Sequence, residues 1–253
     1  MTEAFNPFSL KGKTIIVTGA SSGIGRQCAI DCSRSGANVI MIARDEQRLE
    51  ETKSLLSEGN HVVIAQDIND LPLDFVERIV LDNGHIDGFI HCAGSEKTLP
   101  LKFLKQEDYW QIIQINALSG FEIVRQLSQK RYLSDGASIV FISSISALIA
   151  RVGLTAYAAS KGAILSAVRV MALELAKRNI RVNAISPGTI LTPMMQNALD
   201  SLSDEQRLKR TEGFPLGLGE TSDISYACIY LLSDAARWVT GQNLIIDGGY
   251  TIR

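Results

Sequence analysis

Near its amino terminus the chain reads Thr14-Ile15-Ile16-Val17-Thr18-Gly19-Ala20-Ser21-Ser22-Gly23-Ile24-Gly25. The β-branched run predicts a strand over 14–18, and the glycines let the backbone turn sharply into a helix. Such a loop can approach a pyrophosphate and hold it with N–H groups at the positive helix end. The spacing differs from the common G-x-G-x-x-G, but the order strand, loop, helix favours dinucleotide binding over a plain turn. The expected cofactor contacts are Gly19, Ser21, Ser22, Gly23, Ile24 and Gly25.

The same alternation of strand and helix continues almost to the end of the chain. Strands are predicted at 14–18, 39–42, 62–65, 86–90, 138–142, 181–185 and 244–246. Helices are predicted around 24–35, 46–57, 72–81, 106–131, 155–178 and 222–233. Apolar strands separated by helices indicate a parallel sheet that is covered on both faces. The sequence therefore predicts an α/β fold: a single doubly wound, Rossmann-type domain over 1–253, with a seven-stranded parallel sheet and helices on both faces.

One connection, about 189–220, is too long for a simple turn and is predicted to be a substrate lid. It contains Ser203-Asp204-Glu205-Gln206, a capping-box pattern that predicts the start of a short helix.

Composition excludes several classes of protein. The net charge is −2, and Lys and Arg are dispersed, so no nucleic-acid partner is expected. The first residues do not resemble a signal peptide, and no apolar run approaches the roughly 18 residues that cross a membrane. We therefore expect a cytoplasmic protein with no membrane partner. The four cysteines are expected to be buried structural thiols, with no metal site, although Cys28 and Cys32 stand one helical turn apart.

Tyr157 and Lys161 are candidates for acid–base chemistry. They are four residues apart on a predicted helix, so their side chains share one face. A lysine ammonium close by is expected to lower the tyrosine pKa toward the working range. Ser144 follows the fifth predicted strand, at the edge of the sheet where ligands bind, and its hydroxyl could donate to a carbonyl oxygen. The alternative is an exposed helix pair without catalytic use, which the glycine loop and Ser144 make less favourable.

Arg44 suggests which cofactor binds. NAD-binding sheets carry a carboxylate at the end of the second strand, whereas this strand ends Met41-Ile42-Ala43-Arg44. A guanidinium there can grip a 2′-phosphate, so NADP(H) is favoured over NAD(H). The alternative is that Arg44 pairs with Asp45 or Glu46 as a solvated loop residue.

With the glycine loop and Tyr157-x-x-x-Lys161, the chain resembles the short-chain dehydrogenase/reductase family over essentially its whole length. Within that family it looks most like the 3-oxoacyl-(acyl carrier protein) reductase type. Other matching landmarks are Asp67, Asn116, Ser144, Asn183, Pro187-Gly188 with Thr192, and Asp247-Gly248-Gly249.

The resemblance implies further roles. Lys161 would also bind the nicotinamide ribose, and Asn116 would anchor a water that feeds protons toward Lys161; the alternative for Asn116 is a helix kink. The cofactor would also meet Asp67 and Ile68 at its adenine and Pro187, Gly188, Ile190 and Thr192 at its carboxamide. The chain departs from the family's Asn-Asn-Ala-Gly at His91-Cys92-Ala93-Gly94. Cys92, Ala93 and Gly94 should still allow close approach to the cofactor, whereas the side-chain bond made at position 91 is in doubt.

These features predict an NADP(H)-dependent ketoreductase that is a homotetramer, as in the resembled family. Its substrate is a small carbonyl or alcohol, either a 3-oxoacyl group on acyl carrier protein or a sugar, polyol or other small ketone. Arg178 matches a carrier-docking position of the resembled type, but the nearby turn contains Asp135 where those enzymes tend to have a basic residue. A non-catalytic nucleotide-binding protein or a methyltransferase would have no use for Tyr157 and Lys161.

Overall fold

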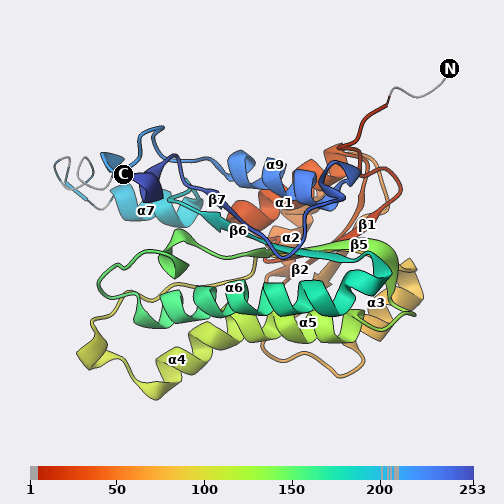
Figure 1. Ribbon diagram of the computed structural model, residues 1–253, viewed down its shortest axis with the longest axis horizontal. Helices are drawn as coiled ribbons and strands as arrows, with labels where there is room; N and C mark the ends of the chain where they lie inside the picture. The colour runs from red at the N-terminus through yellow and green to blue at the C-terminus, as the bar shows by residue number, and fades with distance from the viewer. Residues whose placement is uncertain (1–4, 201, 204, 206, 208–210) are drawn as a thin grey trace.

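The β-branched runs form one parallel sheet in the computed structural model of the chain, which describes residues 5–200, 202–203, 205, 207 and 211–253 (Figure 1). The strands are β1 (Thr14–Thr18), β2 (Asn38–Ala43), β3 (Val62–Ala65), β4 (Ile86–His91), β5 (Leu133–Ile142), β6 (Arg181–Pro187) and β7 (Asn243–Ile246). Their order is β3-β2-β1-β4-β5-β6-β7, and every neighbouring pair is parallel. The connections change direction between β1 and β4, and ligands bind at such a switch point. The predicted seven-stranded Rossmann-type sheet is confirmed.

Helices cover both faces of the sheet, as Figure 1 shows. The described α-helices are α1 (Gly23–Arg34), α2 (Glu46–Lys53), α3 (Phe75–Asn83), α4 (Gln106–Ile113), α5 (Ser119–Leu127), α6 (Thr155–Leu175), α7 (Pro193–Asp200) and α9 (Thr221–Leu232). Alternate strand residues point to opposite faces. Ile15 and Val17 join the core under α1, α2 and α9, while Ile16 joins the core under α3, α5 and α6. Each such side chain contributes about 1.5–3 kcal/mol through burial.

The long helix predicted over 106–131 is interrupted. A π-helical turn, Gln114–Leu118, separates α4 from α5, and α5 ends at Leu127 so that β5 can begin at Leu133. A π-turn inserts an extra residue into a helix and is common at functional sites. Sequence periodicity did not predict this interruption.

The long connection contains α7, Pro193–Asp200, which the sequence did not predict. Residues 204 and 206 of the predicted capping box lie outside the described residues. Within the described ranges, no helix combines the length and apolar composition needed to span a membrane.

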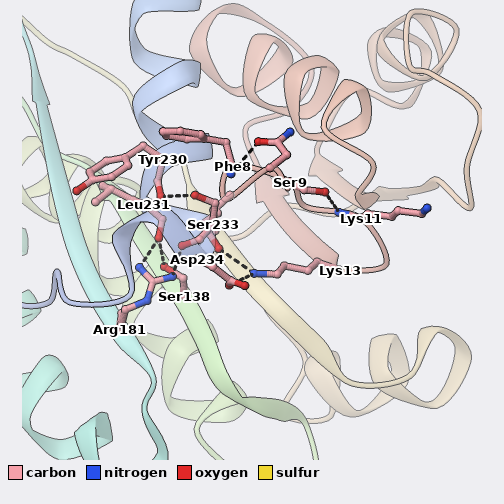
Figure 2. A network of polar contacts seen from close by, with 12 residues as sticks. Phe8, Ser9, Lys11, Lys13, Ser138, Arg181, Tyr230, Leu231, Ser233 and Asp234 are labelled. Atoms are coloured by element: carbon pink, nitrogen blue, oxygen red, sulfur yellow. Dashed lines mark hydrogen bonds and ion pairs between the residues drawn. The ribbon is translucent and has the colours of Figure 1, made fainter. Parts of the chain in front are cut away.

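A polar network around the carboxyl end of α9 lies at the amino-terminal ends of the strands (Figure 2). We call this side the amino-terminal edge of the sheet, and the side of the strand carboxyl ends the carboxyl-terminal edge. Arg181, at the start of β6, donates to the carbonyls of Leu231 and Ser233, and Ser138 Oγ donates to Leu231 O at 2.7 Å. Lys13 Nζ donates to Leu232 O at 3.3 Å and pairs with Asp234 at 3.0 Å. Cations at a helix carboxyl end satisfy its free carbonyls and complement the helix dipole.

Candidate active site

One cleft of about 1190 Å³ lies at the carboxyl ends of β1 to β6. The sequence placed its candidate residues after these strands, and the strand ends bring them together at one edge. Asn116 is the single candidate that does not line the cleft. The candidates that do are Gly19, Ser21, Ser22, Gly23, Ile24, Gly25, Arg44, Asp67, Ile68, Cys92, Ala93, Gly94, Ser144, Tyr157, Lys161, Pro187, Gly188, Ile190 and Thr192.

The loop between β1 and α1 needs its glycines. Gly19 has φ +67°, and a Cβ there would lie 2.9 Å from the Ala93 backbone. A Cβ on Gly25 would collide with the carbonyl of Gly19. A bare backbone at these positions opens a cradle in front of the α1 amino terminus, where N–H groups can receive a pyrophosphate. The site therefore fits the dinucleotide that the sequence implies.

The opposite wall of the cleft follows β6. Gly188 N donates to Ile246 O at 2.8 Å, and a Cβ on Gly188 would lie 2.8 Å from Asp247 Cα. Thr192 approaches the glycine loop, because a Cβ on Gly23 would lie 3.2 Å from Thr192 Cγ2. The segment from Pro187 to Thr192 and the glycine loop thus form two facing walls.

Ser144, Tyr157 and Lys161 meet beside β5. Ser144 follows β5, and its Oγ accepts from Ser146 N at 3.1 Å. Tyr157 and Lys161 lie on the first turns of α6, with Lys161 Nζ 5.7 Å from the centroid of the Tyr157 ring. Lys161 Nζ donates to Ile142 O at 2.7 Å, which anchors the ammonium group to the end of β5. A hydroxyl, a phenol and an ammonium group therefore share one site.

The pKa of Tyr157 corrects the prediction made from the Tyr-Lys spacing. Burial raises its pKa to about 12, while the hydrogen bond with Ser144 lowers it in part. Burial also lowers the pKa of Lys161 to about 8. The expectation that Lys161 brings the tyrosine pKa down is wrong for this chain, because desolvation of the phenol is the largest effect on its pKa. At neutral pH Tyr157 is a protonated phenol.

Asn116 sits in the π-helical turn and is fully buried. Its Oδ1 accepts from Ser95 N at 2.8 Å, and its Nδ2 donates to Ser95 O at 3.0 Å and to Ser160 Oγ at 2.9 Å. Since Ser160 Oγ donates to Tyr157 O, the amide ties the loop after β4 to the turn of α6 that carries the tyrosine. These contacts make Asn116 a brace for the site.

His91 stands where the family pattern has an asparagine, which put the side-chain bond made at this position in doubt. The histidine still makes such a bond. Its Nδ1 lies 3.0 Å from Thr18 Oγ1 on β1, and its Nε2 lies 3.2 Å from Ile115 O in the π-turn. A carbonyl can only accept, so the proton sits on Nε2 and Nδ1 accepts from the threonine. Burial lowers the pKa of His91 to about 3, so the ring is neutral.

The β2–β3 side of the cleft is rich in arginine. Arg44 Nη1 lies 4.0 Å from Asp67 Oδ2, and the Arg44 side chain is 70% exposed. Asp45 accepts from Arg48 N as the α2 cap and pairs with the Arg48 side chain at 3.5 Å. The partner of Arg44 is thus Asp67 and not Asp45 or Glu46. Sequence reasoning missed Arg48, which lies near the start of α2.

Three more charged residues of the cleft escaped the sequence analysis: Glu96, Arg151 and Arg253. They lie in loops and at the carboxyl terminus of the sequence, where no periodicity or spacing marks them.

The four cysteines gather beneath the loop after β4. Cys28 Sγ lies 3.7 Å from Cys228 Sγ, and Cys92 interacts with Cys28 from the end of β4. The contact with Cys228 and then burial raise the pKa of Cys28, whereas its contact with Cys92 lowers it. The contact with Cys28 and then burial raise the pKa of Cys92. Within the described part of the chain no group of three or more His, Cys, Asp or Glu residues is arranged to hold a metal ion.

Comparison with known proteins gives consistent matches. A family profile described as "Enoyl-(Acyl carrier protein) reductase" matches residues 19–251. The chain is 33% identical over 248 residues to "3-oxoacyl-[acyl-carrier-protein] reductase FabG" of Thermotoga maritima, covering 96% of this chain and 99% of that protein. It is 36% identical to "L-rhamnose 1-dehydrogenase (NAD(P)(+))" of Azotobacter vinelandii, with coverage of 94% and 96%. The crystal structure of a short-chain type dehydrogenase/reductase from Mycobacterium marinum matches with a TM-score of 0.87 and 28% identity, covering 98% of each chain.

Proposed function

The chain belongs to the short-chain dehydrogenase/reductase family, and we propose that it is an NADP(H)-dependent reductase that converts a ketone into a secondary alcohol. One observation carries the proposal: Ser144, Tyr157 and Lys161 line the same cleft as the glycine cradle. The cradle would hold the pyrophosphate of a dinucleotide, in the same cleft as these three side chains.

The cofactor would be held by the glycine loop at its pyrophosphate, by Asp67 and Ile68 at its adenine, and by the segment from Pro187 to Thr192 at its nicotinamide. When bound, it supplies a hydride to the carbonyl carbon of the substrate. Lys161 would hold the ribose next to the nicotinamide with the ammonium protons that Ile142 does not use.

Tyr157 is proposed to donate the proton that the carbonyl oxygen receives. Its raised pKa of about 12 keeps the phenol protonated at neutral pH, which suits a proton donor. Ser144 would donate a hydrogen bond to the same oxygen and so stabilise the charge that develops on it. Asn116 would support proton supply to Lys161 through water while its side chain braces the loop at Ser95.

NADP(H) is proposed over NAD(H) because two arginines, Arg44 and Arg48, line the cleft on the β2–β3 side. Each has a carboxylate neighbour, Asp67 and Asp45, at 4.0 and 3.5 Å, so neither guanidinium is neutralised by a close bidentate pair. A 2′-phosphate offers a doubly charged partner whose oxygens can accept two parallel hydrogen bonds from one planar guanidinium.

The substrate is proposed to be a small ketone, such as an oxidised sugar or polyol, rather than an acyl group on a carrier protein. The observation behind this choice is Arg178, which donates to Asp135 at 2.7 Å and to the carbonyls of Ser128 and Leu133. A guanidinium used in this way has few donors left for an acidic carrier. The relatives include both kinds of enzyme, so 3-oxoacyl-carrier reduction stays the second candidate.

Three further properties are part of the proposal. Residues 1–253 form one domain in which 189–220 acts as a substrate lid. The protein is a homotetramer, which the exposed apolar residues Val170 and Leu173 on α6 and Leu244 and Ile245 on β7 support. It acts in the cytoplasm, where free thiols such as its four cysteines are usual.

A substrate panel tests the function. Purified protein is mixed with NADPH or NADH and with ketoses, small keto acids, their esters and 3-oxoacyl thioesters, and loss of the reduced cofactor is followed by absorbance. We expect turnover of a small ketone, with kcat/KM at least about tenfold higher for NADPH. Absence of turnover with every carbonyl compound would contradict the proposal.

A further inference from the structure

Two arginines, Arg151 and Arg253, line the β5–β6 side of the cleft, opposite the side of Arg44 and Arg48. Arg151 belongs to the connection between β5 and α6, which also contains Ser144 and Tyr157. It therefore flanks the reactive groups on the side away from the proposed 2′-phosphate site.

Arg253 reaches the same region through a stack of aromatic rings. Phe214 lies beside the wall of the cleft that follows β6, because a Cβ on Gly188 would lie 3.1 Å from its ring. Tyr250 stacks on Phe214 with ring centroids 4.5 Å apart and an interplanar angle of 28°. The Arg253 guanidinium lies over the Tyr250 ring, with Cζ 4.8 Å from the ring centroid. Phe214 and Tyr250 therefore lie between Gly188 and the Arg253 guanidinium.

Stacking fixes the guanidinium without using its hydrogen-bond donors. A cation–π contact of this kind, with Cζ 4.8 Å from the ring centroid, uses none of the hydrogen bonds that the N–H groups can donate. Gly213 makes room for it, since a Cβ there would lie 2.6 Å from Arg253 Nη2. A guanidinium whose donors stay free can bind a planar anion with two parallel hydrogen bonds.

Neither arginine is neutralised within the described residues. No carboxylate of residues 5–200, 202–203, 205, 207 and 211–253 pairs with the guanidinium of Arg151 or Arg253. The acidic side chain that lines this part of the cleft is Glu96, which accepts from Thr98 Oγ1 at 3.1 Å. Arg151 and Arg253 thus bring two guanidinium groups, neither in an ion pair with a described side chain, into the cleft that Ser144 and Tyr157 line.

We infer that the substrate carries a carboxylate, which Arg253 binds with help from Arg151 while Tyr157 protonates the carbonyl oxygen. The inference rests on the proposed function and narrows its substrate class to keto acids, including oxidised sugar acids. Two guanidinium groups in the cleft favour an acid over its uncharged ester, because only the acid offers them a charged partner for paired hydrogen bonds.

Matched substrates test the inference. Acetoacetate and laevulinate are compared with their methyl esters, using wild type, Arg253→Gln, Arg151→Gln and, as control, Arg237→Gln, which removes an exposed arginine outside the cleft. We expect kcat/KM of the wild type to favour the acids by on the order of tenfold or more, and Arg253→Gln to bring the acid-to-ester ratio toward one, mainly through KM. Arg151→Gln should lower the ratio less, and Arg237→Gln should keep it.

A binding measurement separates this inference from the proposed function. NADPH-loaded protein is titrated by calorimetry with succinate and with succinamide, which has the same shape and no charge. Preferential binding of succinate that Arg253→Gln abolishes supports the inference even if no ketone in the panel is reduced. Equal binding of the two, no binding of either, or a loss of NADPH affinity in Arg253→Gln would overturn it, since the last result would assign the guanidinium to the cofactor.

Discussion

At the amino-terminal edge of the sheet the charged side chains bond to acceptors within the chain, whereas at the carboxyl-terminal edge several do not. Arg181 donates to two carbonyls at the end of α9, and Lys13 bonds to Leu232 and Asp234 (Figure 2). On the opposite edge Arg44 lies 4.0 Å from its carboxylate, and Arg253 rests on an aromatic ring. Both edges belong to the same strands, so the difference comes from the loops that each edge carries.

The contrast separates groups that hold the fold together from groups that are kept for a ligand. A buried cation that bonds to helix carbonyls satisfies the needs of the protein itself. A cation in a cleft with donors left over has its best partner outside the chain. His91 is the exception at the carboxyl edge, because both of its ring nitrogens are used by Thr18 and Ile115.

Tyr157→Phe is expected to give the largest effect. The ring and its packing stay, and only the proton donor is lost, so kcat should fall by about 10²–10⁴-fold. Steady-state kinetics on the best ketone measure the loss, and NADPH fluorescence titration serves as control because cofactor affinity should be kept. Turnover close to wild type would show that another group supplies the proton.

His91→Asn tests whether His91 stabilises the fold rather than binding a ligand. The folded pKa of about 3 lies below the ordinary value of 6.5, so between these pH values the unfolded chain binds a proton that the native chain does not. Stability is therefore lost as pH falls from 6.5 toward 3, by about 1.4 kcal/mol per pH unit. Urea unfolding of His91→Asn should show a weaker loss on acidification, while His85→Asn, at an exposed position, should follow the wild type. Identical acid profiles for His91→Asn and wild type would contradict this reading of the site.

Arg181→Met breaks the closed network at the amino edge. The guanidinium is lost and the carbonyls of Leu231 and Ser233 lose donors, so the free energy of unfolding should fall by about 1–3 kcal/mol. Because this edge is far from the cleft along every strand, kcat/KM should stay near wild type. Arg237→Met, an exposed change, controls for loss of charge. A drop in activity without a drop in stability would mean that the two edges are not independent.

Arg44→Ala is expected to have the smallest effect. The ratio of kcat/KM for NADPH to that for NADH should fall by about tenfold, since one partner of the 2′-phosphate is lost while Arg48 remains. Arg78→Ala removes an exposed arginine that pairs with Asp74 on α3 and should leave the ratio as it was. A ratio that is already near one in the wild type would show that Arg44 does not distinguish the cofactors.

The sequence predicted the strands and the loops that line the site well, because strand ends and glycine positions are local signals. The strands at 14–18 and 62–65 have the predicted bounds, and the residues that follow the strands line the cleft as expected. The π-turn around Asn116 was not predictable, since it depends on the tertiary contact of Ile115 with His91.

Charge placement and pKa direction were also beyond the sequence. Arg253 acquires its position only when Tyr250 stacks on Phe214, residues that no local pattern connects. The spacing of Tyr157 and Lys161 was correct as geometry, but it gave the wrong sign for the tyrosine pKa, because burial is a property of the folded chain.

Amide hydrogen exchange with and without saturating NADPH tests most directly whether the carboxyl edge is the side reserved for the ligand. We predict slower exchange in the loops at 18–25, 43–48 and 187–192, and no change around 230–234 at the amino edge. Protection at 230–234 that matches the loops, or no protection at either edge, would contradict the assignment of the cleft to NADP(H).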